Sequence, residues 1–204
     1  MPLVYTSYFI PHTLYLQNMS YIESNMLPLG TTAPEFSLPD TISGKTVSLA
    51  DVKGAKGTVV MFICNHCPYV IHVNKALVAL AKEYQEIGVG FVGISSNDVE
   101  NYPQDGPDLM KTHALKVGYP FPYLYDETQE IAKIYDAACT PDFYVFNKDM
   151  RLVYRGQLDG SRPNSGKPVT GSDLRAALDS VVLGRPVTTL QRPSGGCNIK
   201  WKKK

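Results

Sequence analysis

Positive charge is missing from the start of this chain, and long hydrophobic runs are missing from all of it. The first basic residue is Lys45, and the apolar patches near the start are interrupted by Pro2, Pro11 and His12. A secretory signal needs a positive start, an unbroken apolar stretch and a small-residue cleavage site. No run reaches the length of a membrane span. We therefore expect a cytoplasmic protein without a membrane anchor, in which residues 1–26 form a disordered N-terminal extension.

An excess of either charge is missing as well. The 204 residues carry 20 Lys and Arg against 19 Asp and Glu, a formal net charge of +1. This balance gives no strong attraction to nucleic acid or to a membrane surface, so we expect neither as a partner. The length suits one domain with a full core, which we place at residues 27–184. The lysines near the end predict a solvated basic tail at residues 185–204.

Cysteine is scarce, but two of the four cysteines are informatively spaced. Four are too few for a disulfide-stapled scaffold of this size. Cys64 and Cys67 form a Cys-x-x-Cys between an apolar strand at residues 58–63 and a helix whose apolar stripe starts at Val70. Two sulfur atoms at this spacing lie within disulfide reach. The positive end of the helix favours the thiolate of Cys64, which we expect on the exposed side of the junction.

Hydrophobic periodicity predicts an α/β protein. An extended segment and a turn at Ser43-Gly44 predict an N-terminal β-hairpin extension. Strands are predicted at residues 58–63, 89–94, 121–126, 143–146 and 152–154. Helices are predicted from Val70 to about Gly88, at residues 107–117 and 128–136, and from Ser172 to about Gly184. Early alternation implies parallel pairing and the last two strands an antiparallel hairpin, which together give a mixed central sheet with helices on both faces.

These features together resemble the thioredoxin fold and, within it, the redoxin branch. The Cys-x-x-Cys after a strand, and Thr140-Pro141 before the closing hairpin, are similar to the two landmarks of that fold. The pattern Gly30-x-x-Ala33-Pro34-x-Phe36-x-Leu38-x-Asp40 is similar to the opening of two redoxin groups. These are the alkyl hydroperoxide reductase/thiol-specific antioxidant (AhpC/TSA) proteins and the TlpA-like thiol-disulfide oxidoreductases. The resemblance covers about residues 28–184.

The resemblance implies thiol-disulfide exchange at the cysteine pair. We expect Cys64 to attack a partner disulfide and Cys67, one turn further on, to resolve the mixed disulfide. The oxidised pair then needs an external thiol reductant, and the partners are thiols or disulfides of proteins or small molecules. The intervening residues, Asn65 and His66, are expected to set the redox poise. An imidazole next to the pair stabilises a thiolate, which predicts a more oxidising protein than an ordinary thioredoxin.

The peroxidase activity of AhpC/TSA proteins is the alternative function. Peroxiredoxins carry a Thr three residues before the peroxidatic cysteine and a Pro four residues before that Thr. With Cys67 at the peroxidatic position, Cys64 and Val60 stand at those two places, which favours disulfide exchange over peroxide reduction. TlpA-like enzymes often carry an acid three residues after the second cysteine, where this chain has Val70. The group that accepts the proton of Cys67 is therefore not assigned.

The second landmark predicts a binding place for substrate. We expect the Thr140-Pro141 peptide bond to be cis, and the backbone of Thr140 to pair with an extended substrate segment. Cys139 precedes this loop, and Cys197 lies in a Gly-rich stretch that we expect to be a flexible tail. Cys139 is either a third redox thiol or a small packed side chain. Cys197 resolves against Cys139, pairs between chains or has no role, and the sequence does not decide among these.

Two other classes of function compete with a redox enzyme. The four cysteines at positions 64, 67, 139 and 197 together could ligate one zinc ion, although structural zinc sites usually show two close pairs of ligands. The chain could also be a non-catalytic interaction module that has kept the fold. Because both sulfur atoms of the motif are present, we favour the enzyme, and we expect no metal and no cofactor.

Overall fold

The computed structural model describes residues 21–203, so predictions for residues 1–20 fall outside it. Within the predicted extension, Tyr21–Glu23 form strand β1. The prediction of disorder up to residue 26 is therefore wrong from Tyr21 onward, because this strand is held by backbone pairing to a distant part of the chain. Among the described residues, no helix combines the length and the apolarity that a bilayer crossing needs.

The centre of the fold is a five-stranded sheet with strand order β6-β5-β4-β8-β9. The strands are β4 (Gly57–Phe62), β5 (Val89–Ser95), β6 (Tyr123–Tyr125), β8 (Asp142–Asn147) and β9 (Leu152–Gly156). The pairs β4–β5 and β5–β6 are parallel, whereas β4–β8 and β8–β9 are antiparallel. This confirms the predicted mixed sheet. The predicted hairpin is also present, formed by β2 (Ser37–Pro39) and β3 (Thr46–Ser48).

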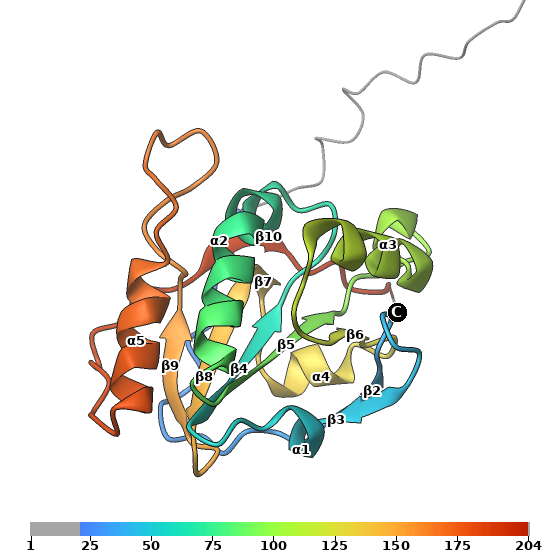
Figure 1. Cartoon of the computed structure of the whole chain (residues 1–204). Coiled ribbons are helices and arrows are strands. Elements are labelled where there is room, and N and C mark those ends of the chain that lie inside the picture. The colour runs from blue at the N-terminus through green and yellow to red at the C-terminus, as the bar shows by residue number, and fades with distance from the viewer. Residues whose placement is uncertain (1–20, 204) are drawn as a thin grey trace, which may run out of the picture.

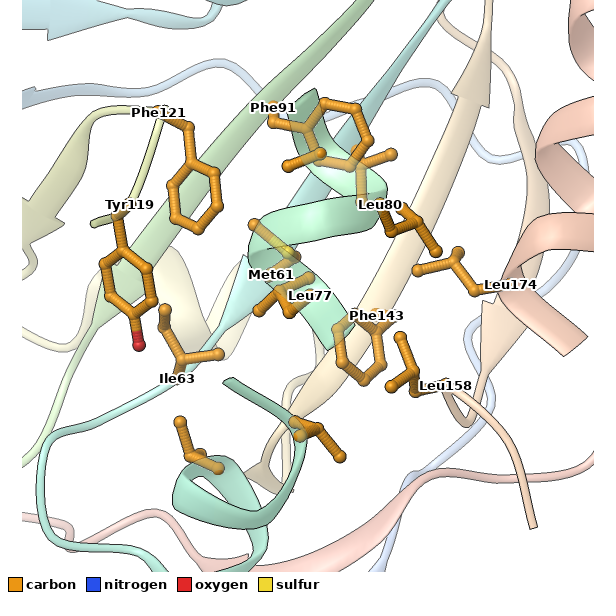
Figure 2. Packing of buried hydrophobic residues seen from close by; sticks show 14 of the residues in the cluster. Met61, Ile63, Leu77, Leu80, Phe91, Tyr119, Phe121, Phe143, Leu158 and Leu174 are labelled. Carbon is orange, nitrogen blue, oxygen red and sulfur yellow. The ribbon is translucent and has the colours of Figure 1, made fainter. Parts of the chain in front are cut away.

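Helices cover both faces of this sheet (Figure 1). One face packs against α2 (Pro68–Gln85), α3 (Pro107–Val117) and α5 (Ser172–Val182), and the other against α1 (Leu49–Val52) and α4 (Glu130–Ile134). Successive side chains of β4 alternate between the two cores, since Met61 joins the first and Phe62 the second. Figure 2 shows Met61 pointing into the first core together with Leu77 of α2 and Phe143 of β8. The apolar stripe of α2 thus fixes its start beside the end of β4.

The end of the chain belongs to the fold. A second sheet has the order β1-β10-β7, in which β10 (Gly195–Asn198) pairs antiparallel with β1 and with β7 (Cys139–Thr140). Figure 1 shows β10 next to the N-terminal end of α2. Lys200 is only 4% exposed. The predicted solvated tail is therefore wrong for the residues from Gly195 to Lys200, since strand pairing and burial hold them against the domain.

Candidate active site

The Cys-x-x-Cys occupies the turn between β4 and α2. Strand β4 ends at Phe62 and α2 begins at Pro68, so Cys67 is the N-cap residue of the helix. Proline suits the first helical position because it has no N–H to leave unpaired there. The sequence predicted the helix end at an exposed Cys64. That premise is wrong, because Cys64 is 1% exposed and lies one turn before the helix starts.

Both sulfur atoms of the motif contact Thr140. The Thr140-Pro141 peptide bond is cis, as the sequence predicted. The Sγ of Cys67 lies 3.1 Å from the carbonyl oxygen of Thr140, to which it donates in the thiol form. The Sγ of Cys64 lies 3.5 Å from the hydroxyl oxygen of the same residue. The two landmarks that are 73 residues or more apart in sequence therefore meet at one place.

The thiolate is favoured at Cys67. Burial opposes it, but hydrogen bonds from the thiols of Cys197 and Cys64 outweigh burial and lower the pKa of Cys67 to about 2. The backbone N–H of Val70, in the first turn of α2, acts in the same direction. Burial raises the pKa of Cys64 well above its usual value, and its hydrogen bond to Cys67 adds to this. The surroundings therefore favour the anion of Cys67, at the N-terminus of the helix, over that of Cys64.

A buried carboxylate, that of Asp105, holds the two residues between the cysteines. Its Oδ1 accepts the backbone N–H of Asn65 at 2.9 Å, and its Oδ2 lies 2.6 Å from Nδ1 of His66. The Asp105 carboxylate thus contacts the His66 ring as well as the backbone of Asn65. The carboxylate also raises the pKa of Cys64. Asp105 ends the short 3₁₀ helix η2 (Pro103–Asp105), which lies between β5 and α3.

The four cysteines do not come together as the zinc site that the sequence analysis gave as an alternative. Among residues 21–203, which include all four cysteines, the ligand-type atoms found within 4.8 Å of one another belong to Cys64, His66 and Asp105. Both oxygens of Asp105 already accept hydrogen bonds, from the Asn65 backbone and from the side chain of Asn97. The cluster is thus better described as part of a hydrogen-bonded turn than as a metal centre.

The backbone of Thr140 faces the chain's own C-terminal strand. In the antiparallel pairing of β10 with β7, Cys197 stands opposite Thr140. A Cβ atom on Gly196 would come within 2.1 Å of the Thr140 carbonyl oxygen, so only glycine permits this approach. The sequence predicted that Thr140 pairs with a substrate segment and that Cys197 is flexible. Instead, β10 occupies this edge and Cys197 is buried.

Cys139 lies apart from the three interacting thiols. It is fully buried, and its Sγ lies 3.7 Å from the carbonyl oxygen of Pro141, to which it donates. Burial raises the pKa of Cys139, and the charge of Asp142 adds to this. These surroundings are those of an unreactive packed thiol.

Below the cis peptide bond lies a buried ion pair that sequence analysis missed. Asp142 follows Pro141, and its Oδ2 lies 3.5 Å from Nη2 of Arg155. Burial raises the pKa of Asp142 to about 6, although Arg155 and a hydrogen bond from Ser24 act in the opposite direction. Arg155 also donates to the hydroxyl of Tyr144 at 2.9 Å. These contacts fix the residue that follows the cis bond, and hence the loop that carries Thr140.

A shallow depression lies beside Pro141. It is lined by Tyr69 and His72 of α2 and by Ser161 and Arg162 from the segment after β9. The Nε2 atom of His72 lies 3.1 Å from the hydroxyl oxygen of Ser161. The sequence could not place the segment of Ser161, because the chain after β9 has no periodic pattern that fixes its position in the fold.

Comparison with known proteins gives a family and two close structural relatives. Residues 29–155 match the AhpC/TSA family. A conserved, uncharacterized protein from Geobacillus kaustophilus is 61% identical, with a TM-score of 0.90 over 92% of this chain and 99% of that one. A hypothetical protein from Sinorhizobium meliloti 1021 is 46% identical, with a TM-score of 0.87 over 89% and 99%. No curated protein sequence matches the chain.

A more distant structure identifies the fold. The thioredoxin domain of a thiol-disulfide oxidoreductase from Bacteroides vulgatus is 20% identical, with a TM-score of 0.53 over 64% of this chain and 89% of that one. The thioredoxin-like fold predicted from the sequence is thereby confirmed. The family match contains Cys64, Cys67 and Thr140 but ends well before Cys197.

Proposed function

The chain belongs to the AhpC/TSA family, and on that premise we propose that it is a thiol-disulfide oxidoreductase acting through the Cys64–Cys67 dithiol. The observation that carries the proposal is the position of Cys67, whose neighbours lower its pKa. Cys67 sits at the N-cap of α2, hydrogen-bonded to the thiol of Cys64 and next to the cis bond of Thr140-Pro141. A thiolate with a second thiol in contact is the arrangement that disulfide exchange requires.

We assign the attack to Cys67 rather than to Cys64, because the helix N-terminus and both neighbouring thiols support the anion of Cys67. Its sulfur attacks one sulfur of a partner disulfide, and the other half of the partner leaves as a thiolate. Cys64 then attacks the Cys67 sulfur, which releases the second half of the partner and closes the Cys64–Cys67 disulfide. The partner gains two electrons and the dithiol loses them. An external thiol returns the protein to its reduced form.

The sequence left open which group accepts the proton of Cys67, the resolving thiol in that prediction. With Cys64 as the resolving thiol, the carboxylate of Asp105 is our candidate for the acceptor of its proton. It lies within 4.8 Å of the Cys64 sulfur, and it is the thiol of Cys64 that must lose a proton before it can resolve the mixed disulfide. Its charge also raises the pKa of Cys64, which keeps Cys64 in the thiol form before it resolves the mixed disulfide. We propose that His66, held beside this carboxylate, tunes the redox potential.

Reduction of insulin disulfides in the presence of dithiothreitol tests the function. We expect the wild-type protein to catalyse the reaction and Cys67→Ser to have only background activity. Cys139→Ser is the matched control, because Cys139 is an equally buried cysteine that contacts Pro141 rather than the dithiol. Full activity in Cys67→Ser would refute the proposal.

A second candidate function, thiol-dependent peroxide reduction, is favoured by the same thiolate. Cys67 stands at the position of a peroxidatic cysteine, and its lowered pKa suits attack on a peroxide oxygen. Attack would give a sulfenic acid at Cys67, which a neighbouring thiol converts to a disulfide with release of water. Consumption of hydrogen peroxide with dithiothreitol as reductant tests this candidate. A rate no higher in wild type than in Cys67→Ser would eliminate it.

A further inference from the structure

We propose that Cys197 is a second resolving thiol, so that Cys67 can close a disulfide with either Cys64 or Cys197. The proposal rests on the exchange function of the dithiol, which it extends by a third cysteine on the C-terminal strand. Cys197 lies outside the part of the chain that matches the AhpC/TSA family. The argument therefore depends on the contacts of β10 alone.

Strand pairing brings Cys197 to the same residue that Cys67 contacts. Cys197 stands opposite Thr140 in the β10–β7 ladder, and the Cys67 sulfur is 3.1 Å from the Thr140 carbonyl oxygen. The position of β10 is closely fixed, because Gly196 approaches that carbonyl and Gly195 packs against the ring of Tyr21. A Cβ on either glycine would meet an atom at 2.1 Å. Cys197 therefore has a fixed position near Cys67, in contrast to the flexible tail that the sequence predicted.

Cys197 lies in the same buried cluster as Cys64 and Cys67. Its thiol, as a donor to the Cys67 sulfur, lowers the pKa of Cys67. Cys64 donates to the same sulfur. The three sulfur atoms are not all within 4.8 Å of one another among the described residues, so Cys67 is the one that the other two share. Cys139, on the neighbouring strand, instead donates to the Pro141 carbonyl.

The chemistry is a balanced internal exchange. In the oxidised protein, the Cys197 sulfur attacks Cys67 in the Cys64–Cys67 disulfide. The Cys67–Cys197 bond forms, the Cys64–Cys67 bond breaks, and Cys64 leaves as a thiolate that takes up the proton lost by Cys197. No electron enters or leaves. Alternatively, Cys197 resolves a mixed disulfide at Cys67 directly and releases the partner's thiol. Either route leaves Cys64 reduced while the protein stays oxidised.

Disulfide mapping tests the inference. The protein is oxidised with diamide, its free thiols are alkylated, and tryptic peptides are analysed by mass spectrometry. Trypsin separates Cys139 and Cys197 from each other and from the peptide that holds Cys64 and Cys67. We expect both disulfides in the wild type and in Cys139→Ser. Folded Cys64→Ser should form the Cys67–Cys197 disulfide and retain one alkylatable thiol, that of Cys139.

The outcome also separates this inference from the proposed function. If oxidised, folded Cys64→Ser retains three alkylatable thiols, and the wild type contains only the Cys64–Cys67 disulfide, the role of Cys197 is refuted while the dithiol mechanism stands. If Cys197→Ser cannot form the Cys64–Cys67 disulfide and Cys67→Ser reduces insulin at the wild-type rate, the function itself fails. The wild-type map decides the question even where a variant does not fold.

Discussion

The two sides of the Cys67 sulfur are built in different ways. On the Cys64 side, a short turn is held by the buried carboxylate of Asp105, and the two cysteines are close in sequence. On the Cys197 side, a strand from the far end of the chain is fixed by its pairing with Thr140 and by the close approach of Gly196. Cys67 therefore has one neighbouring thiol that is close in sequence, Cys64, and one that only the pairing of strands brings near, Cys197. Four predictions test this comparison. The first removes both thiols, the second concerns the ion pair next to the cis bond, and the last two each change one side alone.

Removing both sides at once should have the largest effect. In Cys64→Ser/Cys197→Ser, a mixed disulfide at Cys67 has no neighbouring thiol to resolve it. We expect turnover to fall at least about a hundredfold, because thiols that act as alternatives are lost together. With oxidised glutathione, the double variant should accumulate a stable glutathione adduct at Cys67, measured by mass spectrometry of the intact protein.

Each single variant serves as the control for this pair. Cys64→Ser and Cys197→Ser should both keep measurable turnover and accumulate little adduct. An adduct at Cys64 in Cys67→Ser, formed as readily as the adduct at Cys67 in the double variant, would return the attacking role to Cys64 and contradict our assignment.

Asp142, which follows the cis peptide bond and belongs to neither side, predicts that the free energy of unfolding depends on pH. The pKa of Asp142 is raised from 3.8 to about 6 by burial, so the folded state binds its proton more tightly than the unfolded state does. The stabilisation this gives is fully present below pH 4 and is lost as the pH rises through 6. Relative to Asp142→Asn, the wild type should lose about 3 kcal/mol of unfolding free energy between pH 4 and pH 7.

Urea denaturation of the reduced protein across this pH range measures the effect. Asp149→Asn, at an exposed aspartate in the β8–β9 turn, is the control and should show the same pH dependence as the wild type. If the wild type and Asp142→Asn follow parallel curves, Asp142 does not carry the raised pKa.

The Cys197 side can be disturbed alone at Gly196. In Gly196→Ala, the added methyl group would lie 2.1 Å from the Thr140 carbonyl oxygen, so β10 must shift. Overpacking of this kind costs about 2 kcal/mol. We expect that loss in urea denaturation, together with loss of the Cys67–Cys197 disulfide and retention of the Cys64–Cys67 disulfide. Gly160→Ala, at a glycine with open space around it, should change neither. Unchanged disulfide formation in Gly196→Ala would show that the position of β10 does not matter.

The Cys64 side can be disturbed alone at Asp105. Its negative charge raises the pKa of Cys64, so Asp105→Asn should lower that pKa. The pH dependence of the alkylation rate of Cys64, followed by peptide mass spectrometry, measures this. Asp108→Asn, at an exposed aspartate in the first turn of α3, should leave the rate profile unchanged. A higher pKa in Asp105→Asn would mean that the carboxylate acts through the fold of the turn instead of through its charge.

The sequence predicts the parts of this site that depend on local patterns. The strand before the cysteines, the helix after them and the cis bond at Pro141 all follow from short-range periodicity and from two landmarks. The sequence did not predict strand β10, because its Gly195-Gly196 pair is typical of a loop. Those glycines serve a close backbone approach to residues far away in the chain, which no local pattern records.

The site residues divide in the same way. Asn65 and His66 were found because they lie inside the motif, whereas Asp105 was missed because its contacts with them cross about 40 residues. The sequence placed Cys64 at the positive end of the helix, whereas the N-cap residue is Cys67, one turn further on. The apolar spacing indicates which face of α2 is buried, but not whether the chain between Cys64 and Cys67 is already helical.

The central place of β10 in its three-stranded sheet has a consequence for the choice of partner. Its backbone pairs with β1 on one side and with β7 on the other. A polypeptide that is to pair with Thr140 must therefore displace β10, which is part of the same chain, from both strands. A tether confers an effective concentration that a free peptide seldom matches. On the proposed chemistry, the site therefore discriminates against extended protein segments and selects compact disulfides that reach the thiolate without replacing the strand.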